Sequence, residues 1–485
     1  MDVNHRFRYW QRPRLQALSE KQYEVLYFSA LEVLERTGVK FYSEKAIDLL
    51  REAGAHIIDD KLVKIPSGIV EKAIVSAGKR QTLSNRDGDR VIFLEEDNIY
   101  FGPGSDNPNT IDLDTGERRE CVLNDVVRAA TVTDALENID FAMGFALASD
   151  VNKKNADLYH FEAMINNTIK PVVITAWDPN GLKGIHEMCS LIRGGEENFK
   201  MNPNIILYEQ PSSPLKHSKN STEKLIFCAQ KGIPILYAPT PAIGAASPIT
   251  LAGSFVLNMA EFLSALVLMQ AIKTGSTLVF GGGPTTLDMK TTVYSYAAPE
   301  TMLSLTMRKE AGRYLGLPTF NAGGFSDSKD VDQQASMEAA NSLLFAALAG
   351  GNLIHDVGYL ESGMTSSLEM LAICDEEISL IKRYIGSFPV DTDTLAVDLI
   401  DQVGPEGDFL GTDHTLEHFR EEIWEPTIID RNIHQNWAAA GSKTLRDRAK
   451  EKVQKILGEH KPKQLDDKLK KEISEVVKKY EPQRG

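Results

Sequence analysis

The chain has 485 residues, of which 42% are hydrophobic and 25% are charged, as is ordinary for a soluble globular protein. Its formal net charge of −15 argues against a nucleic-acid partner, which would require a basic face. The four cysteines form no CxxC pair, so a disulfide framework or thiolate metal site is not expected, and a cytoplasmic location fits.

The first part of the chain, residues 1–85, is predicted to be helical and to pack on the rest. Ser19 precedes a run with apolar residues at helical spacing that ends at Gly38, and Ser43 and Pro66 begin two further helices. From residue 82 to about 121, short alternating runs separated by Asp-Asn, Asp-Gly and Thr-Gly turns predict β-hairpins.

After residue 124 a strand–loop–helix rhythm repeats seven times. The predicted strands are apolar on consecutive residues, as expected of parallel strands covered on both faces. They begin near residues 141, 171, 204, 233, 277, 318 and 352. The pattern predicts an α/β fold, a TIM-type (β/α)8 barrel whose eighth strand is irregular or supplied by NIYFGPG near residue 100. A doubly wound open sheet is the alternative, which the lack of a GxGxxG opening disfavours.

These patterns divide the chain into the helical segment 1–85, a catalytic part 86–440 with hairpins and barrel, and a lysine-rich helical tail 441–485. The tail's charges are interpreted as solvated helix faces, with docking to an acidic partner as the alternative. The apolar run 254–272 is interrupted by Asn258 and Glu261. It is therefore interpreted as a helix buried between the sheet and a neighbouring subunit rather than as a membrane span, which makes a homo-oligomer plausible. The N-terminal residues show no apolar signal-peptide segment.

Polar and aromatic residues follow the predicted strands, and in a barrel they share one mouth. The stretch 318–363 concentrates them after two successive strands. The mouth candidates are Tyr100, Phe101, Trp177, Asp178, Tyr208, Glu209, Gln210, Tyr237, Gly281–Gly283, Phe325–Lys329, His355, Asp356, Tyr359 and Glu361. Aromatic faces attract quaternary ammonium ions by roughly 0.5–2 kcal/mol per ring. The alternative for any one ring is that it only packs against loops.

Three weaker sequence patterns each allow more than one interpretation. Gly281–Gly283 after a strand could cradle a phosphate, or could only allow close passage of backbone. His414 and His418 have metal-ligand spacing, but no HExxH accompanies them, and a structural or subunit-contact role is favoured. Carboxylates at the mouth could include a glycosidase-like pair. A serine nucleophile elbow, a P-loop and DxHxxG, the cobalamin-binding loop of many corrinoid proteins, are missing from the sequence.

The run from Gly324 to Lys329, followed by QASMEAANSLLFAALAGGNLIHDVGYLESGM, resembles the trimethylamine methyltransferase family. The segment 407–431 and the N-terminal RPRLQALSEKQ are similar to that family as well. The resemblance covers about residues 10–440 and implies a TIM barrel that moves a methyl group from an amine to the Co(I) of a separate corrinoid protein. The trimethylamine enzymes carry a pyrrolysine, which this sequence lacks. The chain therefore resembles the pyrrolysine-free branch, whose substrates are quaternary amines such as glycine betaine, proline betaine and carnitine.

The resemblance implies an enzyme that binds no cofactor or metal of its own and uses the cobalamin of a cognate corrinoid protein as methyl acceptor. Positioning rather than acid–base catalysis is expected, because a quaternary ammonium already has a neutral amine as its leaving group. The predicted aromatic cage consists of Tyr100, Phe101, Trp177, Tyr208, Phe325 and Tyr359. His355 is predicted to bind a betaine carboxylate, with Gln210, Asp356 and Glu361 as orienting groups. A non-catalytic betaine-binding barrel and a hydrolase using the mouth carboxylates are the alternatives.

Overall fold

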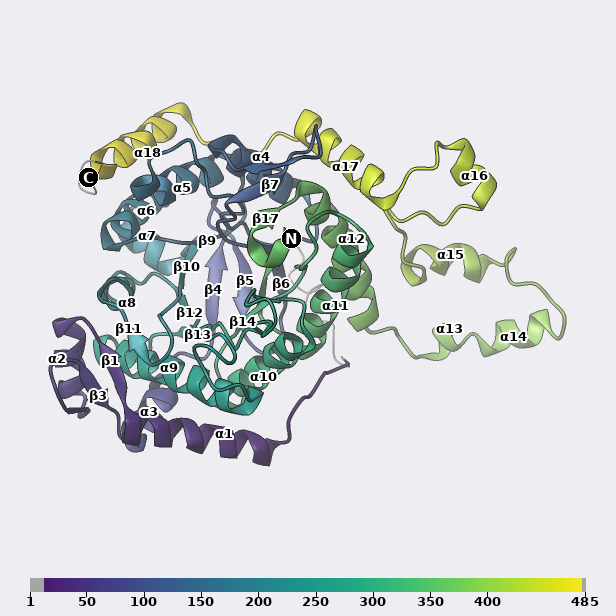
Figure 1. Ribbon diagram of the computed structural model, residues 1–485. Coiled ribbons are helices and arrows are strands. Elements are labelled where there is room, and N and C mark those ends of the chain that lie inside the picture. Colours follow the sequence, from purple (N-terminus) through teal and green to yellow (C-terminus); the bar gives the residue numbers. More distant parts are fainter. Residues whose placement is uncertain (1–12, 482–485) are drawn as a thin grey trace.

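A computed structural model describes residues 13–481. Short parallel strands occupy its centre (Figure 1). They are β6 (Tyr100–Pro103), β9 (Val172–Ile174), β10 (Ile205–Glu209), β12 (Ile235–Tyr237), β13 (Leu278–Phe280), β14 (Phe320–Ala322) and β15 (Leu353–Val357). Hydrogen bonds join them in the orders β13-β12-β10-β9 and β14-β15-β6. The predicted α/β class is confirmed.

Two isolated bridges and one backbone hydrogen bond connect these two groups of strands into a ring. Phe280 pairs with Thr319, which joins β13 to β14, and Ala142 pairs in parallel with Val172 of β9. The backbone N–H of Asp140 donates to the carbonyl oxygen of Phe101 in β6 at 2.6 Å. The segment predicted as a strand from residue 141 therefore takes part only through a single bridge, and β6 supplies a full parallel strand instead.

Helices follow the strands and surround the ring (Figure 1). They are α4 (Leu123–Ala135), α5 (Ala156–Asn167), α6 (Pro179–Ile192), α7 (Glu196–Met201), α8 (Lys219–Lys231), α9 (Leu251–Ile272), α10 (Pro299–Leu315), α11 (Gln333–Ala349) and α12 (Leu368–Ile385). Several begin at a side chain that accepts a hydrogen bond from the first turn, such as Asp178 before α6 and Asp332 before α11. These capping hydrogen bonds fix the point at which each loop after a strand passes into a helix. They thereby fix where the mouth residues lie.

A hairpin closes the end of the ring at which the strands begin. It consists of β4 (Gln81–Ser84) and β5 (Arg90–Leu94), which pair antiparallel. Its side chains Leu83, Ile92 and Leu94 pack into one buried cluster with residues of the strands, including Tyr100 and Leu353. Burial of these side chains stabilises the closed end of the ring and leaves the other end for polar residues.

The apolar helix α9 is covered by the chain's own N-terminal segment. That segment contains α1 (Glu20–Glu32), a π-helical turn (Val33–Thr37), α2 (Glu44–Glu52) and α3 (Ser67–Ser76), and all three α-helices pack on α9. By length and composition α9 is the one described helix that could cross a membrane, yet 78% of its most apolar window is buried. The prediction that a neighbouring subunit covers this helix is wrong, because helices of the same chain occupy that face.

The N-terminal segment was predicted to be helical, but it also contributes strands to a small sheet. Its strands are β1 (Val39–Phe41), β2 (His56–Ile57), β3 (Leu62–Lys64) and β11 (Lys216–His217). β1 pairs antiparallel with β3 and parallel with β11, so it ties the segment to the loop after β10.

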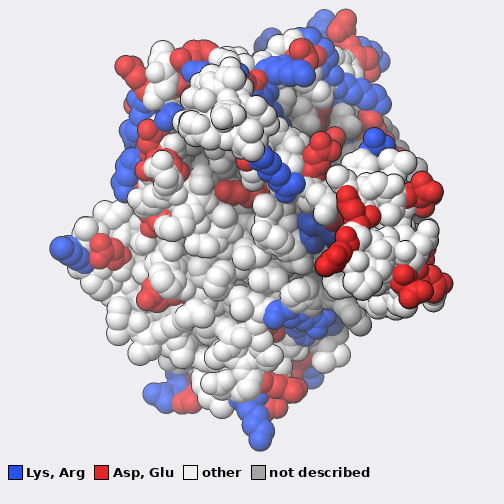
Figure 2. Space-filling model, turned by 90° about the vertical axis from the view of Figure 1, so that its right-hand side faces the viewer, with Lys and Arg blue, Asp and Glu red and all other residues white. Residues whose placement is uncertain are grey.

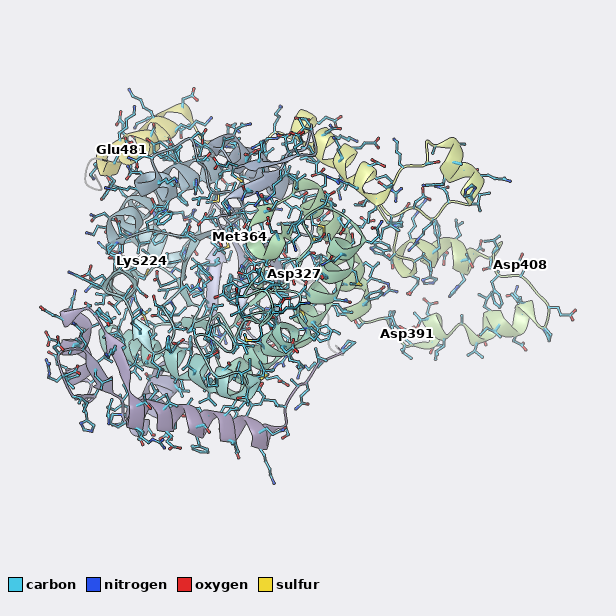
Figure 3. The ribbon with its side chains drawn as sticks, in the orientation of Figure 1. Lys224, Asp327, Met364, Asp391, Asp408 and Glu481 are labelled. Carbon is cyan, nitrogen blue, oxygen red and sulfur yellow. The ribbon has the colours of Figure 1, made fainter. Side chains whose placement is uncertain are left out.

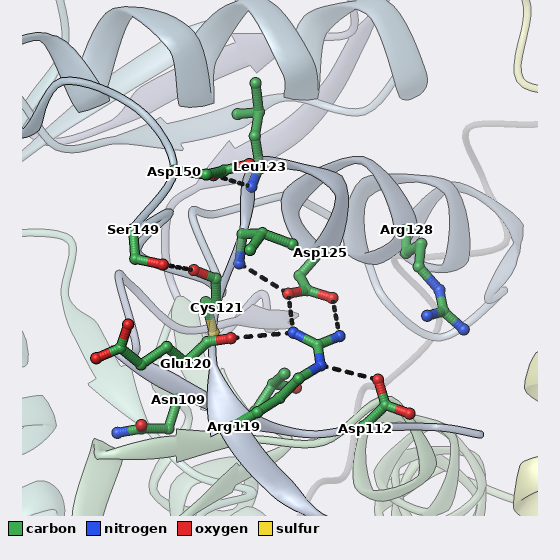
Figure 4. Close-up of polar contacts among 12 residues, drawn as sticks. Asn109, Asp112, Arg119, Glu120, Cys121, Leu123, Asp125, Arg128, Ser149 and Asp150 are labelled. Atoms are coloured by element: carbon green, nitrogen blue, oxygen red, sulfur yellow. Dashed lines mark hydrogen bonds and ion pairs between the residues drawn. The ribbon is translucent and has the colours of Figure 1, made fainter. Parts of the chain in front are cut away.

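A second small sheet lies beside the open end of the ring. It pairs β16 (Tyr359–Leu360), β17 (Thr365–Ser366), β7 (Asn109–Ile111) and β8 (Arg118–Glu120). Arg119 holds this sheet to the start of α4: its guanidinium donates to both Asp125 oxygens at 2.7 and 2.9 Å and to Asp112 at 2.8 Å (Figure 4). The two carboxylates raise the pKa of Arg119. These contacts of Arg119 fix the loop between β6 and β7, which contributes residues to the site described below.

The C-terminal part contains two helices on the body and an arm between them and α12. α17 (Leu445–Glu459) packs on α12 and α4, and α18 (Asp467–Tyr480) packs on α6 and α5. Residues 386–440, called the arm, project sideways from the body (Figure 1). The arm contains α13 (Thr392–Leu395), α14 (Val397–Val403), α15 (Asp413–Glu422) and α16 (His434–Ala439).

Candidate active site

A cavity of about 180 Å³ opens where the strands end. Loops after β6, β10, β12, β13, β14 and β15 all contribute to its wall, and α10 adds three residues from behind. The lining residues are Ser105, Asp106, Asn107, Tyr208, Gln210, Thr240, Gly282, Gly283, Pro284, Thr285, Tyr296, Thr301, Leu305, Arg308, Ala322, Phe325, His355, Asp356, Tyr359 and Gly363. In parallel α/β folds this end of the strands is where ligands bind.

The structure brings together six of the ten predicted site residues in this cavity. They are Tyr208, Gln210, Phe325, His355, Asp356 and Tyr359. The sequence signal for them was their position directly after a predicted strand, and β10, β14 and β15 end close to where the sequence placed their ends.

Four predicted site residues lie outside the cavity. Tyr100 and Phe101 begin β6 instead of following it, because the strand continues through Gly102 to Pro103. Both rings are buried, and the Tyr100 hydroxyl accepts from the backbone N–H of Phe93 in the closing hairpin at 3.1 Å. Trp177 is 54% exposed before α6. A cage containing these three rings is therefore not what the structure forms.

Glu361, the fourth of these residues, is engaged beside the cavity. Its carboxylate receives hydrogen bonds from Arg118 at 3.0 Å and from the Thr365 hydroxyl at 2.6 Å. These contacts join β8 to β17 across the small sheet. Glu361 therefore holds the edge of the mouth and does not face the cavity.

Four aromatic rings do line the cavity: Tyr208, Tyr296, Phe325 and Tyr359. Tyr296 and Phe325 meet edge to face with centroids 5.8 Å apart. The Tyr359 hydroxyl donates to the Ser105 carbonyl, and the Tyr208 hydroxyl donates to the side-chain oxygen of Gln210 at 3.1 Å. Burial, together with the Asp356 carboxylate, raises the pKa of Tyr208 and of Tyr296, so these phenols stay neutral.

Tyr296 was not predicted as a site residue, because it lies in the long loop between β13 and α10 and not directly after a predicted strand. Asp327 holds this loop: its carboxylate accepts from the backbone N–H of Tyr296 at 2.9 Å, from Ser295 at 2.5 Å and from Ser362 at 2.6 Å. One carboxylate thus connects the loops after β13, β14 and β15. Asp327, a mouth candidate from the sequence, acts here through the residues it positions.

Two carboxylates, Asp106 and Asp356, contribute negative charge to the cavity wall. One Asp106 oxygen accepts from the Thr175 hydroxyl at 2.8 Å, while the other is buried without a hydrogen-bond partner. Asp356 has a φ of 72°, a backbone conformation that side chains other than glycine rarely adopt, and its oxygen lies 2.7 Å from Nδ1 of His355. The His355 ring is stacked on Phe320 with centroids 4.1 Å apart.

A buried cation, Arg308, reaches the cavity from the middle of α10 and is only 4% exposed. One guanidinium nitrogen donates to the Phe320 carbonyl at 2.5 Å, whereas Nε has no hydrogen-bond partner. Burial lowers the pKa of Arg308 to about 9, which still leaves it cationic at neutral pH. A buried, incompletely paired guanidinium is suited to bind a carboxylate of a ligand.

The glycine turn after β13 makes room for Arg308. A Cβ on Gly283 would lie 2.7 Å from the guanidinium, and one on Gly282 would lie 1.9 Å from the Pro239 carbonyl oxygen. The N–H of Gly283 donates to Pro239 at 2.7 Å, and that of Gly281 donates to Tyr237 at 2.9 Å. Because these two donors are used within the ring, the turn favours close passage of backbone over a phosphate cradle.

Among the described residues, 13–481, no group of three or more His, Cys, Asp or Glu side chains could hold a metal ion. His414 and His418 lie on α15 in the arm with ring centroids 4.4 Å apart. The nearest acidic partner of His418 is Asp393, at 3.8 Å. This pair is remote in sequence from every residue of the cavity wall.

A family model described as Trimethylamine methyltransferase (MTTB) matches residues 3–485. The chain belongs to this family. It is 33% identical to the Trimethylamine methyltransferase MttB of Desulfitobacterium hafniense (strain DSM 10664 / DCB-2) over 97% of this chain and 95% of that one. It is 29% identical to the Glycine betaine methyltransferase of Desulfitobacterium hafniense (strain Y51), covering 98% of both chains. The protein is accordingly a methyltransferase.

A solved structure resembles the fold at much lower identity. The crystal structure of the hydroxylamine complex of MtmB matches with a TM-score of 0.50 and 13% identity, and covers 90% of this chain and 92% of that one. This likeness concerns the fold alone. Family membership follows from the sequence comparisons.

Proposed function

We propose that this methyltransferase takes a methyl group from a small quaternary amine that carries a carboxylate, with glycine betaine the first candidate, and passes it to the Co(I) of a separate corrinoid protein. The observation that carries the substrate class is that one cavity holds four aromatic rings, two carboxylates and the buried Arg308 guanidinium. Rings and carboxylates favour a quaternary cation, and a guanidinium favours a ligand carboxylate.

The partner's corrinoid would supply a Co(I) nucleophile, and the methyl carbon would leave nitrogen with its bonding pair retained by the amine. Since that amine is neutral as it departs, no residue of this chain has to deliver a proton. The side chains of the cavity bind and orient the cation so that one methyl group faces the open mouth. Arg308 and His355 would fix the carboxylate, and Tyr208, Tyr296, Phe325 and Tyr359 would surround the ammonium.

Arg308 shares with His355 the role that the sequence suggested for His355 alone, binding of the ligand carboxylate. His355 Nδ1 lies 2.7 Å from the Asp356 carboxylate and its ring is stacked on Phe320. Both His355 Nδ1 and Arg308 Nε are buried without a hydrogen-bond partner, but Arg308 is a cation at neutral pH, which favours it for a ligand carboxylate. The proposal also includes a TIM-type (β/α)8 barrel for the ring of parallel strands, and a cytoplasmic location.

The test is isothermal titration against glycine betaine, proline betaine, carnitine, choline and trimethylamine, followed by a Co(I) methylation assay with corrinoid proteins. We expect one zwitterionic betaine to bind and to methylate Co(I). Binding of choline as tightly as any betaine would contradict the role of Arg308. Binding without methyl transfer to any corrinoid protein would favour the betaine-binding alternative.

A further inference from the structure

Selectivity of the site for a cation has to come from the charges in the cavity wall. The chain has a formal net charge of −15, but on the face seen in Figure 2 acidic and basic side chains lie side by side along the edges. Solvent-exposed charges more than about 8–10 Å from a ligand are largely screened by salt. Within the wall, two carboxylates, Asp106 and Asp356, could face the ammonium group of a ligand.

Asp356 is already engaged by other groups of the wall. Its carboxylate oxygen lies 2.7 Å from Nδ1 of His355. Burial lowers the pKa of Arg308, while the Asp356 carboxylate acts on that pKa in the opposite direction, so the two charges interact. The charge of Asp356 is therefore partly compensated within the protein.

Asp106 is held by uncharged groups instead. Its Oδ2 accepts from the Thr175 hydroxyl at 2.8 Å. Its Oδ1 is buried without a hydrogen-bond partner and lies 3.7 Å from Nδ1 of His160. Asp106 forms no ion pair with any Lys or Arg of the described residues 13–481. A bound cation would thus meet a carboxylate whose charge is not compensated by the protein.

The buried cation Lys224 on α8 is used elsewhere. Its ammonium donates to the backbone of the loop after β9 at 2.7 Å and lies 2.5 Å from the Glu209 carboxylate. Figure 3 shows Lys224 to the side of the strand ring, whereas Asp327 and Met364, which belong to the loops of the mouth, lie at its centre. Lys224 and Glu209 form a pair of their own and leave the charge of Asp106 uncompensated.

His160 meets Asp106 as a neutral donor. The ring is 3% exposed on α5, and its Nε2 accepts from the backbone N–H of Ala148 at 3.1 Å. Because Nε2 is an acceptor, the ring proton sits on Nδ1, which is the atom that faces Asp106. A neutral N–H orients a carboxylate without cancelling its charge. His160 does not itself line the cavity, so it acts through Asp106.

The segment 144–148 braces the loop that carries Asp106. The backbone N–H groups of Phe145 and Leu147 donate to carbonyl oxygens of that loop at 3.0 and 2.7 Å. A Cβ on Gly144 would lie 2.3 Å from Oδ1 of Asp106, so the carboxylate packs directly against the glycine backbone. The buried oxygen of Asp106 is therefore held between this backbone and the His160 ring.

We propose that Asp106 selects the ammonium group of the substrate and that His160 is the residue that positions Asp106. This assignment rests on the proposed function and gives the ligand a direction, with its ammonium toward Asp106 and its carboxylate toward Arg308. A quaternary ammonium has no N–H to donate, so its preference for Asp106 is Coulombic and is strengthened by the low dielectric of the cavity. A neutral group of the same shape fills the aromatic rings but gains nothing from Asp106.

The experiment compares glycine betaine with 3,3-dimethylbutanoate, in which carbon replaces the charged nitrogen and the carboxylate is kept. Isothermal titration of the full chain, directly or by displacement of betaine, gives the ratio of the two dissociation constants. We expect wild type to prefer betaine and Asp106→Asn to lower this preference at least tenfold. Asp356→Asn should lower it less, because that charge is shared with His355 and Arg308.

A second set of variants tests His160 by the same ratio. His160→Leu should lower the preference for betaine threefold or more. His160→Gln, whose amide offers one acceptor and one donor, should restore most of it. His186→Leu is the matched control, since His186 is 7% exposed on α6 and outside the cavity wall. A purely structural role of His160 would weaken both ligands equally, and misfolded protein would lower the stoichiometry of both titrations without changing the ratio.

The outcomes separate this assignment from the proposed function. A wild type that binds neither ligand, or binds both equally, overturns the two together. A wild-type preference that survives in Asp106→Asn, or that falls further in Asp356→Asn, overturns the assignment alone. An unchanged ratio in His160→Leu, or an equal loss in His186→Leu, overturns the positioning role of His160.

Discussion

The two ends of the strand ring differ in what fills them. At the closed end, the hairpin side chains Leu83, Ile92 and Leu94 are at most 1% exposed and belong to one buried cluster with residues of the strands. At the open end, the same ring holds two carboxylates, a histidine and a buried arginine around a cavity. Residues a few positions apart in the chain, such as Tyr100 on β6 and Asp106 in the loop after it, thus serve stability at one end and binding at the other.

The largest expected effect is at the open end. Arg308→Met should weaken betaine binding by about 30-fold or more, because truncating one partner of a buried charge pair costs ~2–5 kcal/mol. Isothermal titration measures it. Arg313→Met on the same helix is the matched control, since Arg313 pairs with Asp97 outside the cavity at 2.9 Å. Equal losses in both variants would mean that Arg308 acts only on the fold.

A substitution at the closed end should lower stability and leave betaine affinity unchanged. Ile92→Ala is expected to lower the free energy of unfolding by about 2–4 kcal/mol, because it leaves a void among close-packed side chains. Denaturant unfolding measures this change, and titration should give an unchanged dissociation constant for the folded protein. A large change in affinity would show that the two ends are coupled.

A pH titration sharpens the contrast through Arg308, which binds a carboxylate only as a cation. Since burial lowers its pKa to about 9, betaine affinity should fall by up to tenfold per pH unit above about pH 9. Choline, which has no carboxylate, should not show this loss. Stability has the opposite sign: above about pH 9 the unfolded chain holds the proton that folded Arg308 releases, so this residue's contribution rises with pH. Subtracting the Arg308→Met profile isolates both effects.

The smallest effect concerns one ring of the cavity wall. Tyr296→Leu should weaken binding of any quaternary ammonium by ~0.5–2 kcal/mol, or about 2- to 30-fold, because one cation–π contact is lost. Tyr294→Leu is the control, as Tyr294 is 45% exposed two residues away. A larger effect of Tyr294→Leu than of Tyr296→Leu would mean that Tyr294, and not Tyr296, contacts the ammonium.

The sequence predicted the strands well because buried parallel strands are apolar on every residue. It named Tyr100 and Phe101, which lie within β6, in place of Asp106, which lies in the loop after that strand. Arg308 lies in a run of charges with Lys309 and Glu310 that resembles a solvated helix face, although all three are buried. Helical periodicity could not distinguish a buried charged face from a solvated one, because the polar partners of these side chains come from other parts of the fold, such as the Phe320 carbonyl for Arg308 and the Tyr23 hydroxyl for Glu310.

The burial of α9 has a consequence for how the chain is made. The helices that cover α9 are synthesised roughly 200 residues before it, so they leave the ribosome with their apolar faces unmatched. Once α9 emerges, its cover is already present, and a helix apolar enough to cross a membrane need not stay exposed. Loss of the N-terminal helices should therefore show first as misdirected or aggregated nascent chains, before any effect on catalysis appears.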